Sequence, residues 1–322
     1  MKNKFILVTG GAGYVGSNIC KILNDKGFTP VVFDNLSTGH KEFVKWGPLV
    51  EGDTLNTIDL ETVFQKFSIT SVIHCAAKAY VNESMSDPIK YYRENINGSV
   101  NLLETFIKHK GINFIFSSSC SVYGNSISTK IKENHTTLPI NPYGFTKLAI
   151  ENLIKDLKFI HKFNYAILRY FNAAGADLES EIGEKHDPET HVIPLLVNSS
   201  KNQTVFKIYG NNYSTLDGTA VRDFTHVTDL AIAHSKALDY ISDQKKDIIC
   251  NLGTGVETSI LDLVLQMQKI DPNFKFIFEK YRYGDPSHLV ADNEISRNIL
   301  KLEYANSSVS NILNTALKWS KY

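Results

Sequence analysis

A tyrosine and a lysine stand four residues apart, Tyr143 and Lys147, in the segment NPYGFTK at residues 141–147. Residues four apart share one face of an α-helix, so the phenol and the ammonium would lie side by side. A nearby positive charge favours the phenolate and lowers a tyrosine pKa, which would make Tyr143 a base near neutral pH. Such a pair is also common by chance on a helix surface, so its meaning depends on the rest of the chain.

The sequence predicts a helix that begins directly before this pair. Asn141 is suited to capping a helix N-terminus, and Pro142 suits the first helical position. An apolar stripe with helical spacing then follows, formed by Phe145, Ala149, Leu153, Leu157 and Ile160.

A glycine-rich turn near the N-terminus is typical of phosphate binding. The segment VTGGAGYVG at residues 8–16 follows an expected strand, opens an expected helix, and spaces Gly10, Gly13 and Gly16 three apart. These glycines would allow a tight turn, a close approach of the backbone to a pyrophosphate, and close packing of helix on strand. The free N–H groups of the helix N-terminus would then face the phosphates.

Acidic and small residues at other strand ends indicate which dinucleotide binds. Asp34 ends the second expected strand, where a carboxylate can bind both ribose hydroxyls of NAD and would repel the 2′-phosphate of NADP. Asp53 follows the third strand and could reach the adenine. Ala76 and Ala77 follow the fourth, where small residues would let the backbone pass close to the pyrophosphate, although alanines also pack well beneath helices.

The fifth expected strand ends in FSSSCSVYG, which contributes a further polar group. Ligands of open α/β sheets bind beyond the carboxyl ends of the strands, and a serine hydroxyl there can hydrogen-bond both a substrate oxygen and a tyrosine. Three consecutive serines could also be a plain polar turn. Together with the glycine turn and the Tyr143–Lys147 pair, however, they favour an active site.

The elements around these residues alternate between short apolar runs and helical patterns. Strands are expected at residues 5–8, 31–33, 72–75, 114–116 and 166–168. This alternation predicts an α/β fold, a Rossmann-type doubly wound parallel sheet covered by helices on both faces. We expect a NAD-binding domain at residues 1–174, joined by segments near 205–255, and a smaller α+β substrate-binding cap at residues 175–322.

Composition narrows the possible partners. The 322 residues include 34 acidic and 34 basic side chains, which indicates no field strong enough for nucleic acid or a membrane surface. The four cysteines lie far apart without a C-x-x-C spacing, so we expect no metal site and a reducing, cytoplasmic setting. No apolar run approaches the length of a membrane-spanning helix.

Several motifs resemble those of a known family. The segments TGGAGYVG, SSS before VYG, YGFTK and RYFN are similar to the extended short-chain dehydrogenase/reductases, and DNLSTGH, DGTAVRDFTHV and YRYGDP resemble the narrower family of UDP-glucose 4-epimerases. The similarity covers nearly the whole chain. It implies a tightly bound, recycled NAD, a UDP-sugar substrate, and a homodimer formed through helices near residues 88–109 and 142–162.

The resemblance also assigns roles to residues. It implies a catalytic trio of Ser119, Tyr143 and Lys147. Further cofactor contacts would come from Tyr14, Val15, Asn35, Thr54, Lys78, Asn95, Ser117 and Phe171. Substrate contacts would come from Asn172, His191, Val192, Tyr209, Arg222, Arg282 and Asp285. In this assignment the two arginines bind the diphosphate, Asp285 binds the uridine ribose, and His191 replaces an asparagine near the uracil.

Other activities remain open within this resemblance. Leu289 aligns with the position that limits the size of the sugar C2 substituent and is neither the bulky nor the small choice, so UDP-N-acetylhexosamines are alternative substrates. UDP-pentoses need the same trio. Cys120 and Ser121 stand where sugar-nucleotide dehydratases and decarboxylases carry a carboxylate, which disfavours both. A non-catalytic NAD-binding sensor and a dehydrogenase that releases its reduced cofactor are more distant alternatives.

Overall fold

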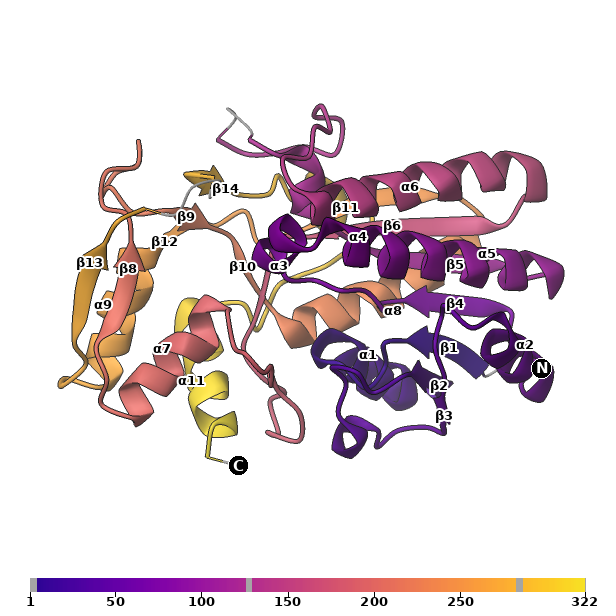
Figure 1. Ribbon diagram of the computed structural model, residues 1–322, viewed down its shortest axis with the longest axis horizontal. Coiled ribbons are helices and arrows are strands. Elements are labelled where there is room, and N and C mark those ends of the chain that lie inside the picture. Colours follow the sequence, from indigo (N-terminus) through magenta and orange to yellow (C-terminus); the bar gives the residue numbers. More distant parts are fainter. Residues whose placement is uncertain (1–4, 126–128, 282–285, 322) are drawn as a thin grey trace.

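The centre of the molecule is a seven-stranded sheet whose neighbouring strands all run parallel (Figure 1). The computed structural model describes residues 5–125, 129–281 and 286–321. In the order of the sheet, the strands are β11 (Ile248–Leu252), β6 (Asn164–Tyr170), β5 (Asn113–Ser119), β4 (Ser71–His74), β1 (Phe5–Thr9), β2 (Thr29–Asp34) and β3 (Leu49–Glu51). The strand order reverses between β1 and β4, which is where such sheets bind their ligands.

Helices cover both faces of this sheet, as the unbroken apolar strands predict. One face carries α1 (Tyr14–Asp25) and α8 (Val227–Gln244), and the other carries α2 (Thr57–Lys66), α5 (Gly98–Lys108) and α6 (Pro142–His161). Each helix turns an apolar stripe towards the strands. The stripes include Ile19 and Leu23 of α1, Leu230 of α8, Phe106 of α5 and Ile154 of α6, all fully buried.

The helix expected near residues 88–109 is built from three pieces. The short α3 (Val81–Ser86) precedes them, and then α4 (Pro88–Tyr91), the π-helical turn η2 (Tyr92–Asn97) and α5 follow one another without a break. Two 3₁₀ turns, η1 (Lys41–Phe43) and η3 (Cys120–Tyr123), follow strands β2 and β5.

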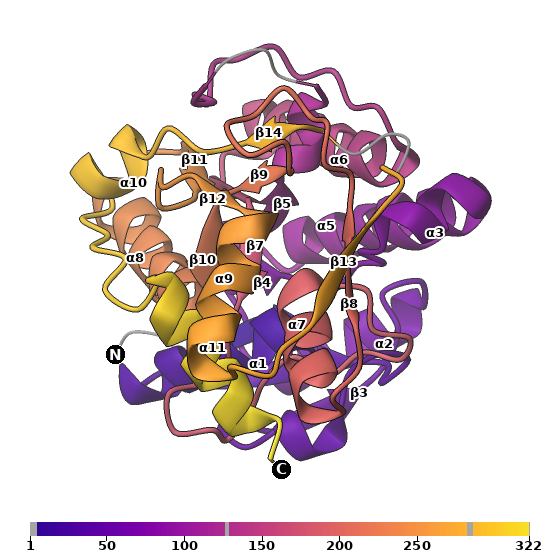
Figure 2. The same ribbon diagram turned by 90° about the vertical axis from the view of Figure 1, so that its left-hand side faces the viewer.

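A second group of elements packs beside the carboxyl ends of the strands (Figure 2). Its core joins α7 (Val192–Lys201), α9 (Ile260–Ile270) and α11 (Val309–Trp319). Short strands pair around them: β8 (Phe206–Tyr209) with β13 (Phe276–Glu279), β7 (Asn172–Ala174) with β10 (Phe224–His226), and β9 (Val221–Arg222) with both β12 (Thr258–Ser259) and β14 (His288–Leu289). The small helix α10 (Glu294–Asn298) lies against β11.

The segment near residues 205–255 divides between the two groups. Strand β11 lies in the central sheet and α8 packs against that sheet, whereas β8 pairs with β13 outside it. The burial of β8 explains the difference, because Phe206 and Ile208 are buried and Lys207 between them is exposed. That alternation suits a strand with one solvent-facing side and does not suit the middle of a doubly covered sheet.

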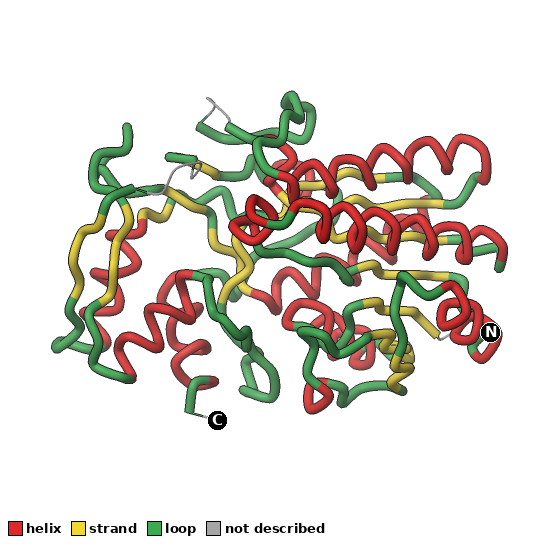
Figure 3. Tube along the Cα trace, viewed as in Figure 1, coloured by secondary structure: helices red, strands yellow, loops and turns green. Residues whose placement is uncertain are grey.

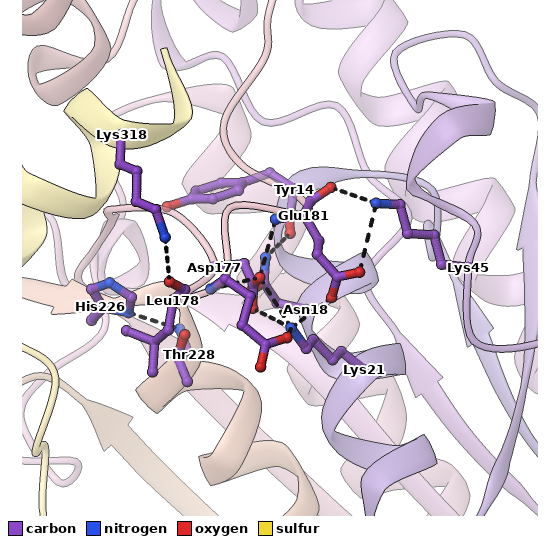
Figure 4. A network of polar contacts seen from close by, with 11 residues as sticks. Tyr14, Asn18, Lys21, Lys45, Asp177, Leu178, Glu181, His226, Thr228 and Lys318 are labelled. Carbon is purple, nitrogen blue, oxygen red and sulfur yellow. Dashed lines mark hydrogen bonds and ion pairs between the residues drawn. The ribbon is translucent and has the colours of Figure 1, made fainter. Parts of the chain in front are cut away.

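A long loop at residues 175–191 connects β7 to α7 and lies between the two groups (Figure 3). Lys21 of α1 reaches this loop and pairs with Asp177, Glu179 and Glu181 at 2.9, 2.7 and 2.8 Å. From the other side, Lys318 of α11 donates to the Leu178 main-chain oxygen at 3.3 Å (Figure 4). The loop is therefore anchored to helices of both groups.

None of the helices within the described residues combines the length and the apolar character that crossing a membrane requires.

Candidate active site

The glycine turn between β1 and α1 leaves no room for side chains at two positions. Gly10 has φ +70°, and a Cβ on it would lie 2.7 Å from the Ala76 nitrogen. A Cβ on Gly16 would lie 2.2 Å from the Gly10 oxygen. Gly13 directly precedes α1, and Tyr14 and Val15 are the first residues of that helix. The turn thus opens the helix N-terminus towards the reversal point of the sheet, as a pyrophosphate cradle requires.

Asp34 stands at the carboxyl end of β2 with its carboxylate held in place. One oxygen accepts from the Ala12 nitrogen at 3.0 Å, and the other accepts from the Leu36 nitrogen at 2.9 Å. Burial raises the pKa of Asp34 above its usual value, while the two N–H donors act in the opposite direction. A carboxylate fixed beside the glycine turn is the arrangement that binds the two hydroxyls of an adenine ribose.

The expected cofactor residues gather around one hollow at this edge of the sheet. The hollow is lined by eight of them: Gly10, Asp34, Asn35, Asp53, Thr54, Ala76, Ala77 and Lys78. Its lining also includes Phe33, Ser37, Thr38, Gly52, Leu55 and Glu94, which sequence reasoning did not select. Ser37 and Thr38 follow Asp34 closely in the sequence. That closeness is the signal that could have identified them as lining residues.

Asn95 lies beside the hollow and fixes the main chain of Lys78, which lines the hollow. Its side-chain oxygen accepts from the Lys78 nitrogen at 2.8 Å, and its amide nitrogen donates to the Lys78 oxygen at 3.0 Å and to Thr146 Oγ1 at 3.1 Å. The amide is thus engaged within the protein. These contacts make Asn95 a positioning residue for Lys78, whose Nζ donates to Ser37 Oγ at 3.1 Å.

The Tyr143–Lys147 pair lies on the first turns of α6, which begins at Pro142 as predicted. Asn141 caps the helix by accepting from the Gly144 nitrogen at 2.8 Å. Lys147 is 3% exposed, and its Nζ lies 5.8 Å from the centre of the Tyr143 ring. The same nitrogen donates to the Ser117 main-chain oxygen at 2.8 Å. The buried ammonium therefore lies beside the half-buried phenol at the end of β5.

Ser119, the last residue of β5, completes the trio. Its hydroxyl oxygen accepts from the Ser121 nitrogen at 3.2 Å. A hydrogen bond between Ser119 and Tyr143 lowers the tyrosine pKa, but burial outweighs it and raises that pKa to about 12. Burial also lowers the pKa of Lys147 to about 8. The expectation that the neighbouring lysine depresses the tyrosine pKa is therefore wrong for the protein by itself, because desolvation is the larger effect.

A buried ion pair behind the trio was missed by sequence reasoning. Glu151 of α6 accepts from Arg169 Nε at 2.9 Å and from Ser118 Oγ at 2.6 Å. On the other side, Tyr170 donates to Ser117 Oγ at 2.8 Å. These contacts fix the serine-rich end of β5 between α6 and β6. The partners lie far apart in the sequence, so spacing alone gives no signal for them.

The expected substrate residues come mostly from the second group of elements. Arg222 on β9 pairs in register with Leu289 on β14, and Leu289 packs against the cluster that contains Phe171. Asn172 begins β7 and Tyr209 ends β8. His191 directly precedes α7 without capping it through its side chain, and Val192 is the first residue of α7. Arg282 and Asp285 lie outside the described residues.

The fold and this site define a dinucleotide-binding enzyme of the short-chain dehydrogenase/reductase type. The chain belongs to the NAD dependent epimerase/dehydratase family, whose model matches residues 6–253.

Individual relatives narrow the comparison. A UDP-glucose 4-epimerase of Rhizobium meliloti (strain 1021) is 44% identical over 305 residues, which cover 94% of this chain and 93% of the relative. The crystal structure of UDP-glucose 4-epimerase from Brucella ovis with NAD is 42% identical, has a TM-score of 0.94 and matches 98% of both chains. A 32% identical epimerase structure from Stenotrophomonas maltophila, with bound NAD and formylated UDP-arabinopyranose, has a TM-score of 0.95 over 99% of this chain and 98% of its own.

Proposed function

We propose that this protein is an NAD-dependent 4-epimerase that interconverts UDP-galactose and UDP-glucose through a transient 4-keto sugar. The observation that carries the proposal is the meeting of Ser119, Tyr143 and Lys147 at the end of β5, beside the nucleotide hollow. Relatives that match nearly the whole chain, including its substrate-binding part, carry this activity in their names.

The lining of the hollow suits the adenosine and pyrophosphate part of NAD. The tight glycine turn can form only because Gly10 and Gly16 lack a Cβ, and Asp34 is held where the adenine ribose would lie. When bound, NAD supplies the hydride acceptor and donor for carbon C4 of the sugar. The chain itself must bind the sugar nucleotide, move the proton of the 4-hydroxyl and keep the 4-keto sugar in place.

Tyr143 is the proton acceptor in this proposal. Because burial holds its pKa near 12, its phenolate needs positive charge close by, and the Lys147 ammonium lies 5.8 Å from its ring. With a pKa of about 8, that ammonium is mostly protonated at pH 7. Ser119 hydrogen-bonds Tyr143 and would hold the 4-oxygen while it becomes a carbonyl.

The second group of elements would hold the UDP moiety. Arg222 and Arg282 suit the diphosphate oxygens, since a guanidinium binds phosphate with two parallel hydrogen bonds. Asp285 would bind the uridine ribose, and Asn172, His191, Val192 and Tyr209 would line the remainder. Anchoring through UDP would keep the 4-keto sugar bound while it turns, so that either face of C4 could be presented to the cofactor.

UDP-pentoses and UDP-N-acetylhexosamines are second candidates. The pentose alternative is favoured by the bound UDP-arabinopyranose derivative of the Stenotrophomonas maltophila structure. Leu289 packs among Cys120, Val122 and Phe171, where its size would decide how large a C2 substituent fits. Relative rates with the three classes of UDP-sugar rank these alternatives.

The chain would divide into a NAD-binding unit of residues 1–174, completed by α8 and β11, and a substrate-binding cap from the remaining residues after 174. A homodimer through the helices near residues 88–109 and 142–162 would cover exposed apolar side chains, namely Ile89, Tyr92 and Phe145, which are 69, 44 and 44% exposed. Light scattering tests the dimer, and a monomer at micromolar concentration would contradict it.

The four cysteines of the chain are free, in keeping with a cytoplasmic location.

The function is tested by incubating the protein with UDP-galactose and no added cofactor. We expect UDP-glucose to form, and we expect Tyr143→Phe to retain the fold and bound NAD but lose about 10²-fold or more in rate, because the proton acceptor is gone. Tyr240→Phe, near the C-terminal end of α8 and outside the trio, is the matched control. Bound NAD without turnover of any UDP-sugar would favour the sensor alternative.

A further inference from the structure

The loop between β7 and α7 brings two histidines and two glutamates into one cluster. Glu184, His186, Glu189 and His191 occur in the segment GEKHDPETH with the spacing E-x-H-x-x-E-x-H. One donor atom from each of them lies within 4.8 Å of all the others. The side chains of Glu184, Glu189 and His186 are 6, 12 and 19% exposed, whereas that of His191 is 44% exposed. None of the four belongs to the catalytic trio, and only His191 is also expected to contact the substrate.

The distances between these donor atoms match those around a small metal ion. His191 Nδ1 lies 2.8 Å from Glu184 Oε1 and 3.3 Å from Glu189 Oε1. His186 Nδ1 lies 3.4 Å from Glu184 Oε1 and 3.6 Å from Glu189 Oε2. Four ligands placed tetrahedrally at about 2.0–2.1 Å from Zn²⁺ are about 3.3 Å apart. The four histidine–glutamate distances, 2.8 to 3.6 Å, lie on both sides of this value.

The two imidazole nitrogens provide an independent observation. Both Nδ1 atoms are shielded from solvent and face oxygens of the same two carboxylates at 2.8 to 3.6 Å. Two imidazole nitrogens and two carboxylates therefore meet in one place, which is a donor set that transition-metal ions accept.

We propose that Glu184, His186, Glu189 and His191 bind a divalent first-row transition-metal ion, with Zn²⁺ the best match to two imidazole nitrogens and two carboxylate oxygens. Two neutral imidazoles, two carboxylates and one divalent ion sum to zero charge, so binding the ion leaves no net charge at the partly buried site. The expectation of no metal site rested on cysteine spacing and did not consider this histidine–glutamate segment.

Surrounding groups hold the proposed ligands in place. The main-chain nitrogens of Thr190 and His191 both donate to a Glu189 oxygen at 2.8 Å. The ring of Tyr80, which precedes α3, meets His186 edge-on with ring centres 5.6 Å apart. Trp319 of α11 donates to the Glu184 main-chain oxygen at 3.3 Å. Such outer contacts orient metal ligands and fix their geometry.

The position of the cluster indicates a structural role for the ion. It would close the segment from Glu184 to His191 directly before α7, in the loop that runs between the two groups of elements (Figure 1). On the sheet side, His40 Nε2 donates to the Lys185 oxygen at 2.9 Å. The ion would therefore fix the entry into α7 relative to α1 and η1, and it would hold the ring of His191.

A rival interpretation makes the same cluster a pair of imidazolium cations bound to two carboxylates, which also sums to zero charge. The two interpretations differ in one measurable property, because only the first takes up a stoichiometric metal ion. The test uses the full-length protein without a histidine tag, stripped with a chelator, dialysed against Zn²⁺ and then against metal-free buffer. Metal content is then measured by mass spectrometry.

We expect one Zn²⁺ per chain in the wild type and a rise in thermal midpoint when Zn²⁺ is added to the stripped protein. His186→Ala/Glu189→Gln should reduce Zn²⁺ affinity by at least about 100-fold, since it removes two ligands. The matched control, His161→Ala/Glu104→Gln, changes the same residue types at exposed positions and should bind like the wild type. No bound Zn²⁺, or equal binding by both double variants, would overturn the proposal.

A second measurement on the wild type keeps the test decisive if the double variant fails to fold. X-ray absorption at the zinc edge should show nitrogen and oxygen ligands at about 2.0–2.1 Å with the scattering of two imidazoles. Sulfur ligands, or no imidazole scattering, would place the ion elsewhere and contradict the site.

Discussion

The Nζ atom of Lys147 donates to the main-chain oxygen of Ser117 at 2.8 Å, which ties the helix that carries the tyrosine to the strand that ends in the catalytic serine. Because α6 and β5 are also joined through Glu151 and Ser118, the trio is held from two sides. The ammonium is consequently fixed beside the phenol and does not move freely in solvent.

Removing this charge should impair proton transfer without unfolding the protein. We expect Lys147→Met to lower the epimerisation rate by about 10²-fold or more and to move the alkaline rise of the pH–rate profile upwards, because the phenolate loses its nearest cation. Lys66→Met, at an exposed position on α2, should behave like the wild type. An unchanged rate and pH profile for Lys147→Met would show that the ammonium does not act on Tyr143.

The glycine turn predicts a defect in cofactor content. A Cβ at residue 16 would lie 2.2 Å from the Gly10 oxygen, so Gly16→Ala must displace the backbone of the turn. We expect a lower thermal midpoint and at least about tenfold less NAD retained on purification, measured by extraction and absorbance. Asn24→Ala, at an exposed position on the same helix, should retain the wild-type amount. Full NAD content in Gly16→Ala would contradict the assignment of the cradle.

Asp34 should set the preference for NAD over NADP. Hydrogen bonds to a charged group contribute roughly 1.5–3 kcal/mol, so Asp34→Asn should weaken NAD binding by about 10- to 100-fold. The same change should weaken NADP binding less, since it removes the repulsion of the 2′-phosphate. Titration calorimetry of both nucleotides checks this, with Asp25→Asn at the exposed end of α1 as the control. An unaltered ratio of the two affinities would exclude Asp34 from the ribose site.

Buried neutral histidines predict a loss of stability in mild acid. Burial lowers the pKa of His74 to about 3 and those of His226 and His234 to about 4. An unfolded chain takes up these protons below about pH 6.5, whereas the folded protein does not, so the unfolding free energy should fall as pH falls from about 6.5 to 4. Each group contributes about 1.4 kcal/mol per pH unit in that window.

Urea unfolding at pH 7 and pH 5 measures this loss, and His234→Gln identifies one contributor. His234 Nδ1 donates to the Leu230 oxygen at 2.8 Å, and glutamine retains a polar group there without titrating. The difference between the two pH values should shrink by about 2 kcal/mol in this variant. An equal difference in variant and wild type would show that His234 does not contribute.

Predictions from the sequence are most accurate where the type of a single residue satisfies a local structural requirement. The glycine turn, the cap at Asn141 and the carboxylate at Asp34 all follow from neighbouring residues and appear where expected. The sign of the Tyr143 pKa shift was missed, because burial depends on the packing of distant segments around it.

Other features depend on how the chain closes in space. Strand β8 contains the same types of apolar residue as the central strands. Only its pairing with β13 reveals that one of its sides faces solvent. The Glu151–Arg169 ion pair joins a helix to a strand, and no rule of sequence spacing predicts such a pair. The histidine–glutamate segment can be read directly from the sequence. Only the folded loop before α7 shows that its four side chains converge.

The measurement that tests the central claim most directly follows the hydrogen at C4 of the sugar. UDP-galactose carrying deuterium at C4 is incubated with the protein in ordinary water, together with an equal amount of an unlabelled UDP-galactose distinguished by mass in its uridine. A hydride held within the site predicts UDP-glucose that keeps its deuterium at C4, with no transfer to the second UDP-sugar. Loss of deuterium to water, or exchange between the two sugars, would contradict the account.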